Sequence, residues 1–86
     1  MIDIQLKDRT AGPVYLQIRT QLEEHIRAGR LGAGEALPSP ASLAQQLSVD
    51  RGEVQRAYFE LEHVGLVTKT VGRDFLGKEK TTYAVK

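Results

Sequence analysis

The chain has 86 residues, enough for one domain with a modest core, and it contains no cysteine, which excludes disulfide frameworks and thiolate metal sites. Its formal net charge is only +1, which is low for a domain that binds nucleic acid by neutralising phosphates. No apolar run approaches the roughly 18 residues needed to span a bilayer, and the polar N-terminus does not resemble a signal peptide, so we expect a cytoplasmic protein.

The first third of the sequence predicts an extended segment followed by a helix. Residues 1–7 alternate, as in a short half-buried strand or an arm packed on the domain, and three apolar side chains fall on one side: Ile2, Ile4 and Leu6. Pro13 suits the first turn of a helix. One apolar face then recurs at spacings of three and four: Tyr15, Ile18, Leu22 and Ile26. We therefore predict a helix over 13–29, with Gly29 as its stop.

A second helix follows a loop over 30–37 that contains two glycines. Ser39 is a preferred N-cap residue, and Pro40 is suited to the first helical position. The sequence thus predicts a helix over 39–48, with a buried side formed by Leu43, Ala44 and Leu47.

The third helix is predicted over 50–65. Asp50 would cap it, and Glu53 stands three residues on, which is a capping-box spacing. One apolar stripe follows: Val54, Ala57, Tyr58, Leu61 and Val64. Gly65 would end the helix. Two short helices joined by a tight turn form a helix-turn-helix, whose second helix can enter a DNA major groove.

The remaining residues, 66–86, predict a small β-wing. Residues 66–71 and 81–85 have the alternation and the β-branched residues of strands. The connection over 72–80 is longer than a tight hairpin and rich in lysine and arginine. The expected fold class is mainly α with a small β-wing: a three-helix winged helix-turn-helix forming a single domain over 1–86.

Several segments of this sequence carry a resemblance in the right order and spacing. They read GPVYLQI at 12–18, IRAGRL at 26–31, GEALPS at 34–39, VQRAY at 54–58 and GL at 65–66. The sequence resembles the N-terminal winged helix of GntR-type bacterial transcription regulators, most of all the YtrA-like branch. The resemblance implies a regulator, of repressor type, that binds double-stranded operator DNA as a homodimer. We expect no cofactor and no effector domain, and no small-molecule effector can be inferred from the sequence.

The sequence departs from the family pattern at positions where DNA contact is expected. Where the family commonly has an acidic residue and then arginine, this chain has Pro40 and Ala41. Glu53 stands near the start of the recognition helix, and Asp74 stands in the wing tip, where each would repel phosphate. An alternative function is therefore a winged-helix protein–protein interaction module with a weakened DNA-binding face and a protein partner.

Nine residues are candidates for DNA contact: Ser39, Ser42, Arg51, Gly52, Gln55, Arg56, Lys69, Arg73 and Lys78. The resemblance favours phosphate or base contact for Arg51. Arg56 would either contact DNA or pair with neighbouring acids on a solvated surface. Gln55 would read an adenine edge or remain an ordinary exposed glutamine. The basic wing residues would form a phosphate or minor-groove arm, or a flexible charged loop.

Catalytic and metal-binding functions find no support in the sequence. His25 and His63 are far apart and lack partners at ligand spacing, and no Ser/His/Asp arrangement or phosphate-binding glycine loop stands out. Tyr15 and Tyr58 lie on apolar helical faces and are expected in the core, whereas Phe59 lies beside its stripe and would be half-exposed at a subunit contact. We expect neither an enzyme nor a metal site.

Overall fold

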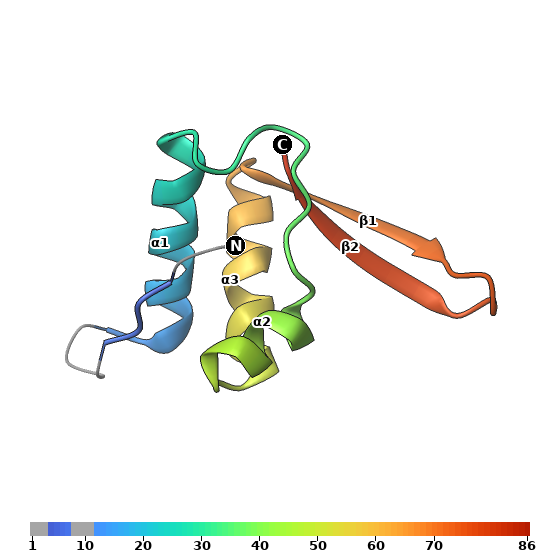
Figure 1. The fold of residues 1–86 in the computed structure, drawn as a ribbon, viewed down its shortest axis with the longest axis horizontal. Helices are drawn as coiled ribbons and strands as arrows, with labels where there is room; N and C mark the ends of the chain where they lie inside the picture. Colours follow the sequence, from blue (N-terminus) through green and yellow to red (C-terminus); the bar gives the residue numbers. More distant parts are fainter. Residues whose placement is uncertain (1–3, 8–11) are drawn as a thin grey trace.

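The computed structural model describes residues 4–7 and 12–86, and within them the chain forms three helices and two strands. In chain order these elements are α1 (Val14–Arg27), α2 (Pro40–Leu47), α3 (Arg51–His63), β1 (Val67–Arg73) and β2 (Glu79–Val85). The helices lie together, and the β1–β2 hairpin extends away from them as an arm (Figure 1). The predicted class, a three-helix winged helix-turn-helix with a small β-wing, is confirmed.

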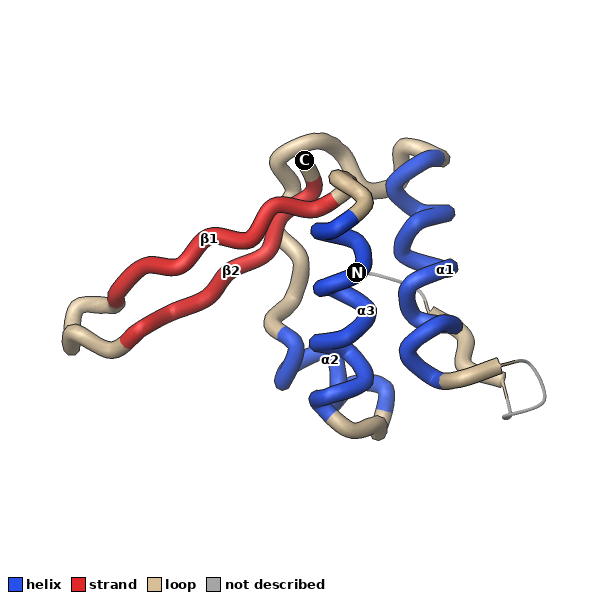
Figure 2. The backbone as a smooth tube through the Cα atoms, turned by 180° about the vertical axis from the view of Figure 1, so that it is seen from behind, coloured by secondary structure: helices blue, strands red, loops and turns tan. Residues whose placement is uncertain are grey.

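α3 lies between α1 and the hairpin and supplies much of the core (Figure 2). Its fully buried side chains pack with those of α1, α2 and β1: Val54, Ala57, Tyr58, Leu61, Ile18, Leu22, Leu43 and Val67. Each large apolar side chain buried in this way contributes about 1.5–3 kcal/mol. The prediction that Val64 completes the stripe is wrong, because this side chain is 58% exposed. Val64 is the C-cap of α3, where the chain leaves the helix before turning at Gly65.

The predicted end of α1 is close to the observed one, but its start is capped differently from the prediction. Pro13 is the N-cap residue and not the first residue of the helix. Gly29 follows the C-cap with φ of +79°, the left-handed conformation that glycine adopts without strain. The last helical residue is Arg27, so the helix is shorter than the predicted range of 13–29.

Residues 4–7 form an extended arm along α1 and no strand. The backbone N–H of Gln5 donates to the side-chain carbonyl of Gln21 at 2.7 Å, and the Gln21 amide donates to the Gln5 carbonyl at 2.7 Å. Ile4 is buried in the core. Of the two predictions for this segment, a strand or an arm, the arm is the one that residues 4–7 adopt. Residues 1–3 lie outside the part of the chain that the structure describes.

The two helices of the helix-turn-helix begin with different caps. Ser39 caps α2 as predicted, since its hydroxyl accepts the Ser42 N–H at 3.1 Å. Asp50 is the N-cap residue of α3, but among the described residues its side chain makes no capping hydrogen bond. The predicted capping box is therefore wrong, because the Glu53 carboxylate is engaged elsewhere, by α1.

The wing is an antiparallel pair whose strands reach further than predicted. The register runs from Val67 opposite Val85 to Arg73 opposite Glu79. The long connection predicted over 72–80 is wrong, since the turn occupies only residues 74–78. Asp74 closes this turn by accepting two backbone N–H groups, which lets the ladder continue to its end.

The loop over 30–37 also contributes to the sheet. Ala36 forms a single antiparallel bridge with Ala84, and the Leu37 N–H donates to the Tyr83 carbonyl at 2.8 Å. The segment before α2 thus pairs with β2 on the edge away from β1. The sequence did not predict this pairing, because the glycines of the loop indicate irregular backbone and a single bridge leaves no periodic pattern of apolar residues.

Candidate nucleic-acid interface

An open groove of about 250 Å³ lies where the start of α2, the start of α3 and the wing meet. We call it the α2–α3–wing groove, and its lining consists of Ser39, Pro40, Ala41, Arg51, Gln55, Lys69, Thr81 and Tyr83. Four of the nine candidate residues therefore come together here although they belong to three elements. These four residues supply two cations, an amide and a hydroxyl, which are groups that contact phosphates and base edges.

Tyr58, a buried residue of α3, contacts both the segment before α2 and the wing, which form the other two walls of this groove. Its hydroxyl donates to the Pro38 carbonyl at 2.8 Å, immediately before the cap of α2. Its ring meets the ring of Tyr83 on β2 edge-on, with centroids 4.9 Å apart. Burial, with a smaller contribution from Tyr83, raises the pKa of the Tyr58 hydroxyl well above its usual range. The hydroxyl therefore stays protonated as a donor.

The start of α3 presents an open face beside the groove. Arg51 and Gln55 are exposed and one helical turn apart, so they share one side of the helix. Gly52, which follows Arg51, is also exposed, and a Cβ added there would meet nothing within 4 Å. This part of the helix backbone is therefore bare enough for close approach by a large ligand.

The two serine candidates differ in position. Ser39 lines the groove, although its hydroxyl oxygen already accepts the Ser42 N–H. Ser42 is exposed on α2 but lies outside the lining of the groove. Its backbone N–H completes the cap, so its side chain is the part left to contact a ligand.

The wing candidates lie along one side of the hairpin and at its tip. Lys69 and Arg73 point to the same face of β1, because they are four residues apart on a strand. That face includes Tyr83, the partner of Lys69 and part of the groove lining. The Arg73 guanidinium donates to the Gly77 carbonyl at 3.1 Å, and Lys78 is exposed in the turn.

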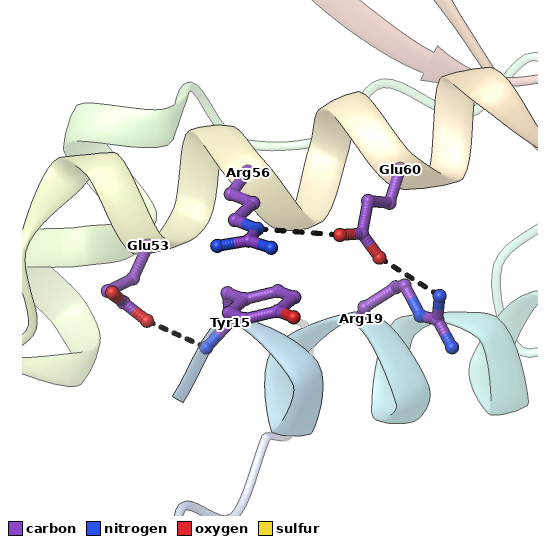
Figure 3. Close-up of polar contacts among 5 residues, drawn as sticks. All are labelled: Tyr15, Arg19, Glu53, Arg56 and Glu60. Carbon is purple, nitrogen blue, oxygen red and sulfur yellow. Dashed lines mark hydrogen bonds and ion pairs between the residues drawn. The ribbon is translucent and has the colours of Figure 1, made fainter. Parts of the chain in front are cut away.

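Arg56 lies on a different side of α3, facing α1 (Figure 3). Its guanidinium carbon is 3.9 Å from the centroid of the Tyr15 ring, and its Nε is 3.5 Å from a Glu60 carboxylate oxygen. Glu60 also pairs with Arg19 of α1 at 2.9 Å. The arginine is thus placed among partners within the protein and outside the groove. The prediction that Tyr15 lies in the core is wrong, since this side chain is only partly buried and the guanidinium covers its ring.

Glu53 completes this α1–α3 seam, which consists of Tyr15, Arg19, Glu53, Arg56 and Glu60. Its carboxylate accepts the Tyr15 backbone N–H at 2.8 Å, in the first turn of α1 (Figure 3). The N-cap of α1 is Pro13, which has no side-chain acceptor, so Glu53 takes that role from another helix. Sequence reasoning missed this contact, because its two residues are 38 positions apart.

Residues 14–75 match the family described as "Bacterial regulatory proteins, gntR family". The chain belongs to the GntR family. The resemblance seen in the sequence is thereby confirmed.

Proteins similar to this chain include two that are named YtrA, one of which is described as a GntR-family transcription factor. The HTH-type transcriptional regulator Rv1152 of Mycobacterium tuberculosis is 46% identical over 71% of this chain and 50% of its own length. The HTH-type transcriptional repressor YtrA of Bacillus subtilis is 36% identical over 81% of this chain and 54% of its own length. The solved YtrA of Sulfolobus acidocaldarius superposes with a TM-score of 0.75 and 34% identity, covering 99% of this chain and 79% of that one. The chain spans about half the length of these two curated relatives.

In this GntR-family domain the two unexpected acids are held by backbone donors. Glu53 binds the first turn of α1, and Asp74 accepts the N–H groups of Leu76 at 2.9 Å and Lys78 at 3.0 Å. Glu53 lies outside the groove lining. Asp74 could have been recognised as a turn former, because aspartate side chains commonly accept backbone N–H groups two residues on.

Charge in this GntR-family domain is unevenly distributed. Residues 67–86 carry five lysines and arginines against two acids, a net charge of +3. Residues 1–66 carry seven basic residues against nine acids, a net charge of −2. The small overall charge therefore conceals a basic wing. Within the described residues, no helix is both long and apolar enough to cross a bilayer.

Proposed function

We propose that this domain binds double-stranded DNA through the α2–α3–wing groove and acts as a sequence-specific transcription regulator. The start of α3 enters the major groove, and the wing follows the backbone beside it. The observation that carries the proposal is the convergence of Arg51, Gln55 and Lys69 at one groove. Arginine and lysine neutralise phosphates, and a glutamine amide matches the edge of adenine.

The proposal includes repression by a homodimer that occludes a promoter or operator. It is supported by the Bacillus subtilis relative, which is named a repressor. A two-fold dimer would protect two half-sites about 34–36 Å apart, one helical turn of DNA. Footprinting on a selected site tests this spacing, and protection of a single half-site would contradict the homodimer.

The alternative of a protein-interaction module loses part of its basis. It depends on Ala41, Glu53 and Asp74 weakening the DNA-binding face. Two of these residues have carboxylates that accept backbone N–H groups, which lowers their repulsion of phosphate. Ala41 lines the groove without a charge, so it removes a contact and adds no repulsion.

Fluorescence anisotropy with a pool of random duplexes, repeated over a salt series, tests DNA binding. The logarithm of the binding constant should fall linearly with the logarithm of the salt concentration, because bound counterions are released. Arg51→Ala should weaken binding and reduce the magnitude of this slope by about 1. The matched control is Arg27→Ala, which removes the same charge from an exposed ion pair with Glu23 on α1.

The two variants separate a specific contact from a general charge effect. A normal salt slope for Arg27→Ala beside a reduced one for Arg51→Ala supports binding at the groove. Equal losses in both variants would contradict the assignment of the groove. If the unaltered protein bound no duplex even at low salt, DNA binding itself would be refuted and a search for a protein partner would follow.

A further inference from the structure

The tip of the wing carries two large apolar side chains that are mostly exposed to solvent. Phe75 is 95% exposed and Leu76 is 67% exposed, and both lie in the turn between β1 and β2. Turns are ordinarily polar, and an exposed phenylalanine there contributes no burial to the fold. These two adjacent side chains are therefore available for a contact outside the domain.

The turn beneath these side chains is held by several hydrogen bonds. The Asp74 carboxylate accepts the N–H groups of Leu76 and Lys78, and the Asp74 carbonyl accepts the Gly77 N–H at 2.9 Å. The Asp74 N–H donates in turn to the Lys78 carbonyl at 2.9 Å. Gly77 has φ of +81°, which glycine adopts without strain. The backbone at the tip is preorganised, so a contact made by Phe75 would require little further ordering.

Cations stand behind the apolar tip on both faces of the hairpin. Arg73 lies on the face that continues into the groove, and the register places Lys80 on the opposite face. Lys78 lies in the turn itself. An apolar point flanked by cations matches the chemistry of DNA seen from its minor groove, where stacked bases lie between two rows of phosphates.

The length of the arm agrees with this placement. Its strands have seven residues, and at about 3.3 Å per residue they carry the tip about 20 Å from the helices (Figure 1). Half a turn of B-DNA, the step from a major groove to the neighbouring minor groove, is about 17 Å. With α3 in the major groove, the tip would therefore reach the adjacent minor groove.

We propose that Phe75, with Leu76 beside it, is a wedge that inserts between base pairs from the minor groove and kinks the duplex. This inference rests on the proposed DNA binding and goes beyond it, because it assigns an unstacking contact to the wing tip. Arg73, Lys78 and Lys80 hold the phosphates on either side. Pyrimidine–purine steps unstack most easily, so the wedge favours TA or CA steps about half a turn from the contacts of α3.

The test uses a duplex selected from a random pool by the protein, with 2-aminopurine replacing adenine at successive positions. Unstacking raises the fluorescence of this base, so binding should produce a signal at one step about half a turn from the contacts of α3. Phe75→Ala should remove that signal and weaken binding about tenfold, equivalent to about 1.4 kcal/mol. Its salt slope should not change, because no charge is lost.

Two further variants define the result. Phe75→Trp keeps a large ring and should keep the signal, whereas Val64→Ala, which trims an apolar side chain 58% exposed at the end of α3, should change neither signal nor affinity. Unchanged fluorescence and affinity in Phe75→Ala, with normal binding of the unaltered protein, would overturn the wedge alone. If Phe75→Ala lost self-association in light scattering but kept the 2-aminopurine signal, the tip would be assigned to a protein contact. That result would also overturn the wedge. Failure of the unaltered protein to bind any duplex would overturn both proposals.

Discussion

Replacing Tyr58 by phenylalanine removes one hydroxyl from the centre of the fold and keeps the ring. The hydroxyl donates to the Pro38 carbonyl at 2.8 Å, and the side chain is fully buried. A hydrogen bond of this kind contributes about 1 kcal/mol net. Pro38 is only partly buried, so water can replace part of the lost contact and the cost stays near that value.

The expected loss is large relative to the stability of so short a chain. An 86-residue domain has about 4–13 kcal/mol of unfolding free energy, so Tyr58→Phe removes roughly a tenth to a quarter of it. The melting temperature should fall by about 4–8 °C for each kcal/mol lost. Tyr15→Phe is the matched control, since Tyr15 is partly exposed, and its effect should stay within about 0.5 kcal/mol.

The difference in unfolding free energy between the unaltered protein and Tyr58→Phe should depend on pH, which gives a sharper test. Burial raises the pKa of the folded Tyr58 hydroxyl far above the usual tyrosine value, so the folded state holds this proton more tightly than the unfolded state. The stability associated with the neutral hydroxyl is complete below a pH of about 10 and is lost as pH rises towards the folded pKa. Each pH unit in that window costs the unaltered protein about 1.4 kcal/mol, a loss that Tyr58→Phe does not suffer.

Urea unfolding of both proteins, followed by circular dichroism at several pH values, measures the difference directly. The unaltered protein should be more stable at neutral pH, and its advantage should vanish near a pH of about 11. Tyr58→Phe changes no other side chain, so the difference between the two proteins reports on the Tyr58 hydroxyl. An advantage that stayed constant through this pH range would refute the reasoning, because it would mean that ionisation of Tyr58 is not coupled to unfolding.

Two further predictions concern single residues outside the core. Glu53→Gln should destabilise the domain by about 0.3–1 kcal/mol, because a neutral amide interacts less favourably with the N-terminus of α1 at Tyr15. Thermal melting at low salt measures this, and Glu79→Gln, on an exposed position of β2, should melt normally. Gly77→Ala should cost about 1–2 kcal/mol, because φ is +81° there. Gly72→Ala is its control in the same melt, since a Cβ at that strand position meets nothing within 4 Å, and an equal loss in both variants would contradict the backbone argument.

The spacing of apolar residues along the sequence was sufficient to predict the three helices. Ile18 and Leu22 share one face of α1 at a spacing of four, and Leu43 and Ala44 form the buried side of α2. These patterns depend only on the pitch of a helix, so they can be read without knowing what packs against them. The same reasoning failed at Val64, because the stripe continues in the sequence beyond the point where the helix ends.

Contacts between distant segments could not be predicted in this way. Glu53 has the spacing of a capping box with Asp50, yet its carboxylate binds the first turn of α1. Local pattern identifies an acid near a helix start, but it does not show which of two helix starts lies closer in the fold. Arg56 is a similar case: its partners, Tyr15 and Glu60, become apparent only when α1 and α3 are packed together.

The candidate site was predicted in part, because its residues are chemically suitable but their directions depend on the fold. Arg51, Gln55 and Lys69 meet at the groove because α3 packs against α2 and the wing, and Tyr58 contributes to this packing through Pro38 and Tyr83. The sequence presents Tyr58 only as one more apolar position, so neither its hydrogen bond to Pro38 nor its ring contact with Tyr83 could be predicted.

The distribution of charge reconciles a nearly neutral chain with the proposed DNA binding. The sum of +1 argues against strong attraction to phosphate, but a sum says nothing about position. At the α1–α3 seam, the Glu53 carboxylate accepts a backbone N–H of α1, and the Glu60 carboxylate pairs with two arginines. Both acids lie on a side of α3 away from the groove. The surplus cations lie on the wing, where residues 67–86 carry +3. A molecule with this charge distribution would approach DNA with its wing foremost. The distance from the wing to α3 would then determine which groove the helix enters.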